Sequence, residues 1–264
     1  MNPLAPICNP KYSIPRMIGR IIVNHFHHSC RLNAKSKIQS SHEWILRQKK
    51  DPYVEKARVM NYRCRSAFKL LEMDERYRFL YPGQCVVECG AAPGSWTQVL
   101  VSKTNSDRKD GGKPVGQVIS VDRLPLYHVE GATLLGGSDF TDKAVQQHIT
   151  ELLGNGKADA VLSDMAPNAT GVKELDHESI AQLAYSVLKF AVKISRAASK
   201  TVCLIKVWDG GRSKQLQTEM QRFYKQVRTV KPSASRMNSA EIYLLGIGFR
   251  GLLKKDACSQ QNIS

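Results

Sequence analysis

Short apolar runs alternate with longer amphipathic stretches along the chain from residue 84 onward. Seven apolar runs have the length of β-strands, and they lie at about 85–89, 115–121, 132–135, 158–163, 201–207, 227–230 and 241–248. Stretches with helical periodicity follow four of them, at about 95–102, 141–153, 177–198 and 214–226. These repeated units predict an α/β fold, with a mostly parallel seven-stranded sheet and helices on both faces. Such a sheet binds its ligand beyond the carboxyl ends of its strands.

Residues 43–80 precede this pattern and combine helix formers with many basic side chains. Asp51 and Pro52 are a favourable helix start, and residues 66–74 predict a second helix with apolar side chains to pack. The basic residues favour contact with nucleic acid because they lie beside aromatic ones, although a solvated helical face remains the alternative. They are Arg47, Lys49, Lys50, Lys56, Arg58, Arg63, Arg65 and Lys69.

The charge balance points to a polyanionic partner. The 264 residues contain 39 Lys and Arg against 23 Asp and Glu, so the formal net charge is +16. A hydrophobic fraction of 42% excludes a wholly disordered chain. No apolar run approaches the roughly 18 residues of a membrane helix, so membrane insertion is not expected. The seven cysteines include no C-x-x-C pair, which argues against a zinc site or a disulfide framework.

The N-terminal region has a composition of its own. Residues 1–42 contain six basic residues and no acidic one, and residues 16–23 alternate basic and apolar positions. This pattern is typical of an organellar transit peptide, and a disordered basic arm that touches RNA is the alternative. We therefore expect a presequence at 1–42, a folded domain at 43–250 and a disordered tail at 251–264. The polar, glycine-rich stretch at 104–114 predicts a surface loop.

The segment after the first strand predicts a ligand-binding loop. Its sequence is ECGAAPGSW at 88–96, with glycines four positions apart. The spacing differs from the G-x-G-x-x-G of dinucleotide-binding folds, which disfavours a nucleotide-linked dehydrogenase, and the Gly-Lys-Ser/Thr of a phosphate loop is missing. The small residues allow close approach of a ligand to the backbone. We expect Trp96 to belong to the core.

Acidic residues stand at the ends of four predicted strands. Asp122 can accept both hydroxyl groups of a ribose, and Asp139 can accept from an adenine amino group. Glu88 can bind an ammonium group or a loop amide. With Asp164, these carboxylates predict a nucleoside site without a phosphate cradle, which suits S-adenosylmethionine; a helix N-cap is the alternative for any one of them. No metal site is expected.

Five motifs resemble the FtsJ/RrmJ family of ribosomal RNA 2′-O-methyltransferases, and the mitochondrial members in particular. They are YRCRSAFKL at 62–70, ECGAAPGSW at 88–96, LSDMAPNATG at 162–171, LIKVW at 204–208 and SRMNSAEIY at 235–243. The resemblance implies a Rossmann-like class I methyltransferase fold with S-adenosylmethionine as cofactor. It also implies methylation of a ribose 2′-hydroxyl, of a uridine, in mitochondrial large-subunit ribosomal RNA, free or within a pre-ribosomal subunit in the matrix.

The resemblance also assigns site residues by position. The family's catalytic tetrad falls on Lys69, Asp164, Lys206 and Glu241. The implied cofactor contacts are Gly90, Ala91, Ala92, Pro93, Gly94, Ser95, Trp96, Asp122, Asp139, Phe140 and Asp164.

Methyl transfer to a hydroxyl needs alignment and a group that receives a proton, but no metal. A lysine in a dry pocket or beside another cation releases its proton more readily and can act as a base. Lys206 is the candidate for this role, with Asp164 to orient it, Lys69 as the second cation and Glu241 completing the hydrogen-bond frame. Methylation of transfer RNA and a non-catalytic RNA-binding role in ribosome assembly remain as alternatives.

Overall fold

A computed structural model describes residues 51–154, 156–167 and 170–251 of the chain. The chain divides into two units at residue 50, and the described residues all belong to the second unit, Asp51–Ser264. The expected presequence at 1–42 lies outside the described residues, together with residues 43–50 and all but the first residue of the expected tail. The boundaries of these regions stay predictions.

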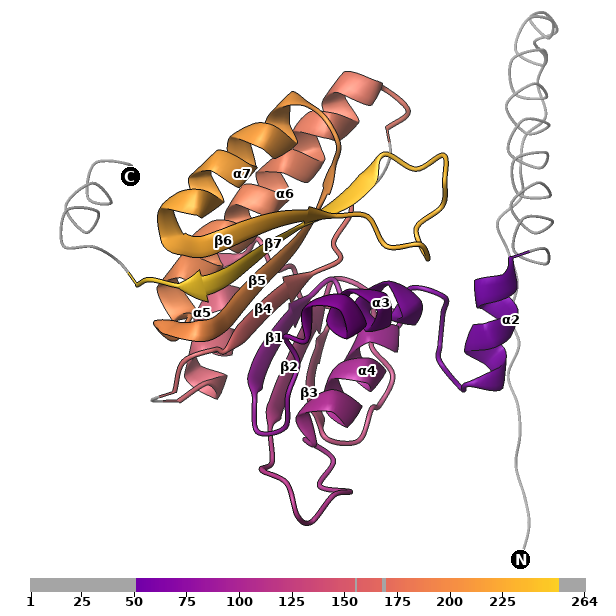
Figure 1. Cartoon of the computed structure of the whole chain (residues 1–264), viewed down its shortest axis with the longest axis vertical. Coiled ribbons are helices and arrows are strands. Elements are labelled where there is room, and N and C mark those ends of the chain that lie inside the picture. Colours follow the sequence, from indigo (N-terminus) through magenta and orange to yellow (C-terminus); the bar gives the residue numbers. More distant parts are fainter. Residues whose placement is uncertain (1–50, 155, 168–169, 252–264) are drawn as a thin grey trace, which may run out of the picture. The chain divides into compact units, whose positions relative to one another are not determined.

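Seven strands form one sheet in the order β3-β2-β1-β4-β5-β7-β6 (Figure 1). Strand β7 runs antiparallel to both of its neighbours, and the other adjacent strands are parallel. The predicted α/β fold with a mostly parallel seven-stranded sheet is therefore confirmed. The strands are β1 (Cys85–Cys89), β2 (Gln117–Asp122), β3 (Ala132–Gly136), β4 (Ala160–Ser163), β5 (Ala198–Trp208), β6 (Tyr224–Val230) and β7 (Glu241–Phe249).

Helices cover both faces of the sheet, as the sequence predicts. On one face α3 (Ala67–Tyr77) and α4 (Ser95–Thr104) share a core cluster with the strands. On the other face α5 (Lys143–Leu152), α6 (Lys173–Ile194) and α7 (Gly211–Phe223) share a second cluster with them. The short helix α2 (Pro52–Val59) packs on α3, and Asp51 caps it by accepting a hydrogen bond from the amide of Tyr53 at 3.1 Å, as the Asp-Pro pair predicts.

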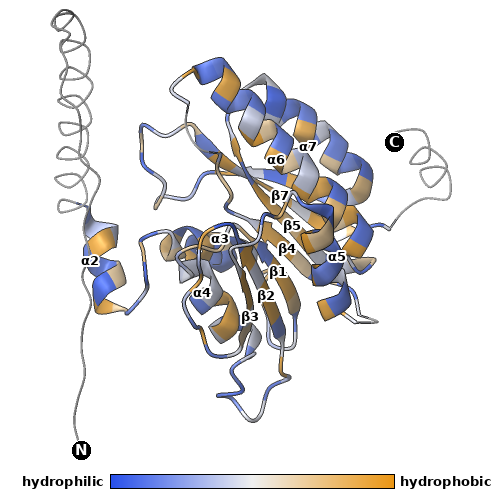
Figure 2. Cartoon of the chain, turned by 180° about the vertical axis from the view of Figure 1, so that it is seen from behind, coloured by the Kyte–Doolittle hydropathy of each residue, from blue (hydrophilic) through white to orange (hydrophobic). Residues whose placement is uncertain are grey.

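The central strands read as continuous apolar runs because both of their faces are buried (Figure 2). Val86 and Leu162 face the cluster under α3 and α4, whereas Val87 and Val161 face the cluster under α5 to α7. All four side chains are fully buried. The alternation of side chains along each strand thus supplies two hydrophobic cores from the same short segments.

Two predicted helices are displaced along the sequence. The helix expected at 177–198 is α6, which begins at Lys173 and ends at Ile194. It begins earlier because the Asp176 carboxylate accepts hydrogen bonds from the amides of Thr170 and Gly171, at 2.7 and 3.2 Å, and so organises the turn before the helix. The helix expected at 214–226 ends at Phe223, since the following residues pair with β7 as strand β6.

The expected surface loop at 104–114 is partly wrong. Thr104 ends α4, and Thr104, Asn105 and Ser106 are buried. The Asn105 side-chain amide donates to the carbonyls of Asp110 and Lys113 at 2.8 and 3.1 Å, so a buried polar residue holds this loop against the domain.

Three further features concern the described part of the chain. No helix there is long and apolar enough to cross a bilayer. Its four cysteines, Cys64, Cys85, Cys89 and Cys203, are free thiols. A cluster of three or more residues able to hold a metal ion does not occur within residues 51–154, 156–167 and 170–251.

Candidate active site

The acidic strand ends meet at one edge of the sheet. In the parallel register Cys89 lies beside Val121 of β2 and Ser163 of β4, so Asp122 and Asp164 follow at the same level. A cavity of about 770 Å³ opens there and extends to the first half of α6. Six of the predicted cofactor contacts line it: Gly90, Ala92, Asp122, Asp139, Phe140 and Asp164.

Glycine is required where the loop after β1 crosses the loop after β4. Gly90 has a φ of +84°, and a Cβ atom there would lie 2.8 Å from the backbone nitrogen of Met165. The amides of Gly90 and Ala92 are held by the Val121 carbonyl at 2.9 Å and by the Asp122 carboxylate at 2.8 Å. The loop therefore presents bare backbone to the cavity in a fixed position.

The other five predicted cofactor contacts do not line the cavity. They are Ala91, Pro93, Gly94, Ser95 and Trp96. Trp96 is 2% exposed, and its indole N–H donates to the Ser66 carbonyl at 2.8 Å, which confirms that it belongs to the core. Gly94 has a φ of +104° and is the N-cap residue that precedes α4. Direct contact of these five residues with a cofactor remains a prediction.

Both carboxylates expected to bind the nucleoside also hold their own loops. Asp122 accepts from the amides of Ala92 and Leu124, each at 2.8 Å through a different oxygen. Asp139 accepts from the Thr141 hydroxyl and amide at 2.7 and 2.8 Å, and these bonds lower the pKa of its carboxyl group. A carboxylate oxygen has two lone pairs, so both residues keep accepting capacity toward the cavity.

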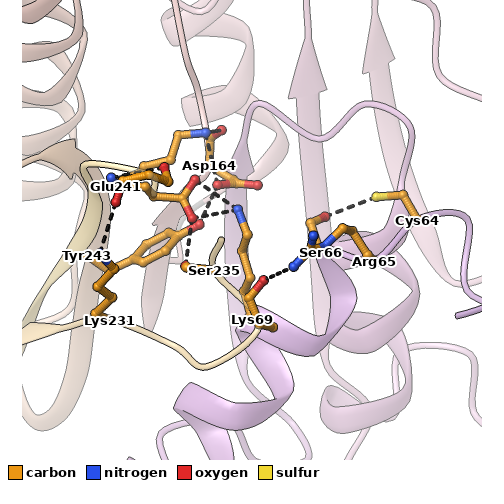
Figure 3. A network of polar contacts seen from close by, with 12 residues as sticks. Cys64, Arg65, Ser66, Lys69, Asp164, Lys231, Ser235, Glu241 and Tyr243 are labelled. Atoms are coloured by element: carbon orange, nitrogen blue, oxygen red, sulfur yellow. Dashed lines mark hydrogen bonds and ion pairs between the residues drawn. The ribbon is translucent and has the colours of Figure 1, made fainter. Parts of the chain in front are cut away.

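The four residues of the predicted tetrad come together from α3, the end of β4, β5 and β7. Lys206 is 8% exposed, and its Nζ lies 3.0 Å from Oδ1 of Asp164 and also donates to the Asp164 carbonyl. Lys69 pairs with Glu241, with 2.6 Å between Nζ and Oε1 (Figure 3). The tetrad is thus two ion pairs, and Asp164, which lines the cavity, joins it to the expected cofactor site.

Two further residues complete this network, and the sequence reasoning gave neither a role. The Tyr243 hydroxyl donates to Oδ1 of Asp164 at 2.7 Å, and the Ser235 hydroxyl donates to Glu241 at 2.8 Å (Figure 3). Burial raises the pKa of Tyr243 well above its usual value, and Asp164 and Glu241 raise it further, so the phenol stays a donor. Strand alternation could have identified Tyr243. It lies two positions after Glu241 on the same strand, and residues two apart point to the same face of a sheet.

The ion pairs also set the charge of Asp164. Burial alone would raise its pKa, but the positive charges of Lys206 and Lys69 outweigh burial, and the pKa is lowered. Asp164 is therefore a carboxylate that neutralises Lys206 at the wall of the cavity. This arrangement can hold an ammonium group in a fixed direction at a site that water reaches poorly.

Glu88 differs from the other acidic strand ends. It is 1% exposed, and its Oε2 accepts from the hydroxyls of Thr97 and Ser120, both at 2.6 Å. The expected ammonium or loop-amide partner is not among its contacts in the described structure. Burial raises the pKa of its carboxyl group to about 7, against the effect of the two hydroxyl donors. Glu88 lies beneath α4 rather than on the cavity wall.

Three of the basic residues for which the sequence favours contact with nucleic acid have internal partners in the structure. Arg63 donates to three backbone carbonyls, Arg65 pairs with Asp51 and the Ala234 carbonyl, and Lys69 pairs with Glu241. Lys56 and Arg58 on α2 are exposed. Charge counting cannot distinguish these cases, because it ignores the acceptors that the fold brings near each cation.

The fold, the cavity and the tetrad can be compared with known proteins. The model of the FtsJ-like methyltransferase family matches residues 62–249. The chain belongs to this family. The predicted resemblance is thereby confirmed, and so is the prediction that the protein is an enzyme that transfers methyl groups. Methyltransferases of the FtsJ-like family in general use S-adenosylmethionine.

Individual relatives within the FtsJ-like family share most of their length with the chain. Over 219 residues it is 54% identical to "rRNA methyltransferase 2, mitochondrial" of Drosophila melanogaster, covering 83% of this chain and 87% of that protein. It is 42% identical over 211 residues to the protein of the same name in Caenorhabditis elegans, with shares of 79% and 94%. "Ribosomal RNA large subunit methyltransferase E" of Parvibaculum lavamentivorans is 43% identical over 220 residues, with shares of 83% and 85%.

A solved structure of the FtsJ-like fold resembles the chain as well. It is a Plasmodium falciparum protein assigned as a ribosomal RNA methyltransferase, with a TM-score of 0.63 and 26% sequence identity. The match covers 72% of this chain and 100% of that one.

Proposed function

We propose that this enzyme transfers the methyl group of S-adenosylmethionine to a ribose 2′-hydroxyl, of a uridine, in mitochondrial large-subunit ribosomal RNA. The observation that carries the chemistry is the ion pair between the buried Lys206 and Asp164, of which Asp164 lines the cavity. The substrate is taken from two relatives named mitochondrial rRNA methyltransferases and from one named for the large ribosomal subunit. The enzyme would act in the mitochondrial matrix and support ribosome biogenesis.

The residues of the cavity fit the parts of the cofactor. Asp122 would accept hydrogen bonds from the two ribose hydroxyls, and Asp139 would accept from the adenine amino group, beside Phe140. The backbone at Gly90 and Ala92 would lie against the cofactor because no side chain intervenes. S-adenosylmethionine supplies a methyl group activated by a positively charged sulfonium, and the sulfur is left as part of a neutral thioether.

The task left to the protein is to align the target hydroxyl and to take or direct its proton. Lys206 points toward Asp164 at the cavity, so we assign it the proton-steering role. Asp164 and the Tyr243 hydroxyl fix the direction of the ammonium group, and the Lys69–Glu241 pair provides the second cation beside the substrate. Lys206 would receive the hydroxyl proton as the unprotonated amine, and such base catalysis contributes roughly 10²–10⁴-fold in enzymes, to which alignment adds.

Ribosomal RNA also fits the charge of the protein. A formal net charge of +16 favours a polyanion, and contacts with phosphates supply most of the affinity of such complexes. Free RNA or a pre-ribosomal large subunit would present the same phosphate backbone. The target nucleotide would be turned out of its stack toward the cavity.

Methyl transfer from labelled S-adenosylmethionine tests the proposal. The full chain is incubated with mitochondrial large-subunit RNA, pre-ribosomal particles or transfer RNA, and labelled nucleosides are identified after digestion. The expected product is 2′-O-methyluridine in the ribosomal RNA. Lys206→Ala should lower the rate by at least about 100-fold while the protein still folds. Lys189→Ala, which changes an exposed lysine on α6, is the matched control and should keep the rate.

Three results would contradict the proposal in different ways. Label in transfer RNA alone would change the substrate. Binding of both the cofactor and the RNA without any label would favour an assembly factor that keeps the fold. Normal turnover by Lys206→Ala would remove the proposed role of that lysine.

A further inference from the structure

One guanidinium group fastens two loops that are far apart in the sequence. Arg63 lies between α2 and α3, and its Nη1 donates to the carbonyls of Pro93 and Tyr127 at 2.9 and 3.0 Å. Its Nη2 donates to the carbonyl of His128 at 2.7 Å. Three backbone acceptors from two different loops therefore converge on a single cation.

Both loops belong to the cofactor cavity. Pro93 lies in the loop after β1, which contributes Gly90 and Ala92 to the cavity wall. Tyr127 and His128 lie in the loop after β2, and the end of β2 at Asp122 with the first loop residues, Arg123 and Leu124, lines the cavity as well. Arg63 itself is not part of the wall. It holds the two loops together from their outer side.

The position of Arg63 is fixed by its own neighbours. Its backbone amide donates to the side-chain oxygen of Gln98 on α4 at 3.0 Å, and the Gln98 side-chain amide donates to the Asn61 carbonyl at 2.9 Å. A Cβ atom at Gly94 would collide with the Arg63 guanidinium, so this glycine gives the arginine its space. Although the three guanidinium bonds lie at the surface, the backbone bond to Gln98 and the space at Gly94 fix where the arginine stands.

The chemistry of arginine suits this task better than that of lysine. A guanidinium is planar, stays charged and has five N–H donors in a fixed fork, so one group can bind several carbonyls at once. A lysine has a compact ammonium group on a flexible chain and cannot span the same acceptors in one plane. A shorter or neutral side chain would leave the carbonyls of both loops without this partner.

We propose that Arg63 is a positioning residue for cofactor binding, which keeps the loops after β1 and β2 in the arrangement that accepts the nucleoside. The inference rests on the proposed function in one respect, namely that S-adenosylmethionine is the ligand of the cavity. It assigns to Arg63 a role different from the RNA contact expected of a basic residue in this region.

Isothermal titration of the full chain with S-adenosylmethionine tests the inference. Arg63→Ala should raise the dissociation constant by at least about tenfold, the equivalent of the loss of one net hydrogen bond to a charged group. Arg63→Lys should recover only part of the affinity. Adding guanidinium to Arg63→Ala, below denaturing concentrations, should restore binding in part, because the free ion can occupy the same three acceptors.

The neighbouring Arg65 provides the matched control. Its guanidinium contacts Asp51 and the Ala234 carbonyl, which belong to neither loop. Arg65→Ala should therefore leave the dissociation constant within about twofold of the wild type and should show no rescue by guanidinium. Thermal melts without ligand are recorded for each variant to verify folding.

The outcomes separate the inference from the proposed function. If Arg63→Ala binds the cofactor as the wild type does, or if both arginine variants lose affinity equally and neither is rescued, the positioning role is wrong. If Arg63→Ala weakens binding of the ribosomal RNA and leaves cofactor affinity unchanged, Arg63 is an RNA contact. If the wild type itself does not bind S-adenosylmethionine, the proposed function fails first.

Discussion

At the scale of single residues, the half-buried carboxyl group of Asp164 and the buried one of Glu88 have opposite electrostatic environments at the same sheet edge. Asp164 has two lysines nearby, which lower its pKa in spite of burial. Glu88 accepts from two hydroxyl donors and has no cation beside it among the described residues, and burial raises its pKa to about 7. A hydroxyl group stabilises a carboxylate less than a full positive charge does, so only Asp164 gains enough to overcome desolvation.

Glu88 should therefore make the stability of the protein fall as the pH rises. Its pKa is near 4.5 when unfolded and about 7 when folded, so between these values the folded state binds more protons than the unfolded state. Glu88→Gln removes this loss. The unfolding free energy of the variant minus that of the wild type should therefore increase by about 3 kcal/mol from pH 4.5 to pH 8.

Urea denaturation at several pH values measures this difference. Glu55→Gln changes an exposed carboxyl group on α2 and should show the same pH dependence as the wild type. A constant gap between Glu88→Gln and the wild type at all pH values would mean that Glu88 titrates normally.

At the scale of elements, helix α3 organises the catalytic side of the molecule. It carries Lys69, which pairs with Glu241 of β7, and Glu72, which holds the loop before β7. Oε2 of Glu72 accepts from the amide of Ala234 at 3.0 Å, and its Oε1 accepts from the Tyr53 hydroxyl at 2.8 Å. The same loop supplies Ser235 to Glu241. The helix therefore fixes both the lysine and the frame around its partner.

Removing the hydrogen bonds of Glu72 should lower both the stability and the activity, and the loss should be larger when more of these bonds are removed. Tyr53→Phe removes one hydrogen bond to Glu72 and should cost about 1 kcal/mol with little effect on the rate. Glu72→Ala also leaves the buried amide of Ala234 without its acceptor. We expect it to cost about 2–3 kcal/mol and to lower kcat several-fold because Ser235 and Glu241 lose their support.

Chemical denaturation and single-turnover methyl transfer measure the two effects. Equal losses for Tyr53→Phe and Glu72→Ala would show that the contact with Ala234 contributes nothing. A destabilised Glu72→Ala variant with an unchanged rate would separate the loop from catalysis.

At the scale of the whole chain, the basic charge is unevenly distributed. Residues 1–42 hold six of the 39 basic residues and none of the 23 acidic ones, and they lie before the part matched by the family model, which starts at residue 62. Positive charge without acidic residues is what a mitochondrial presequence requires, because the membrane potential favours entry of cations into the matrix.

The prediction for this region is that residues 1–42 direct a fluorescent reporter to mitochondria. Changing Arg16, Arg20 and Arg31 to serine should redistribute the reporter to the cytosol, since half of the positive charge is lost. Microscopy with a matrix marker and protection from added protease measure the outcome. A reporter that stays in the cytosol with the native residues 1–42 would assign this segment to another role.

Sequence patterning alone was enough to predict the succession of strands and helices along the chain and the edge of the sheet where the site lies. Short apolar runs become central strands because both of their faces must be buried, and parallel strands bring their carboxyl ends to one side. Sequence position alone therefore predicts three residues that line the cavity, namely Asp122, Asp139 and Asp164. The five motifs identify the family, and the tetrad that they predict includes Lys206 and Lys69.

The ion pairs and hydrogen-bond partners of several charged groups became apparent only in the folded chain. Lys69 and Glu241 lie 172 positions apart, and nothing periodic in the sequence links them. The pattern of residues also gives no sign of the contacts of Arg63 with two loops or of the burial that raises the pKa of Glu88. Hydrophobic patterning fixes which face of an element is buried, whereas the partner of a polar group depends on acceptors delivered by distant segments.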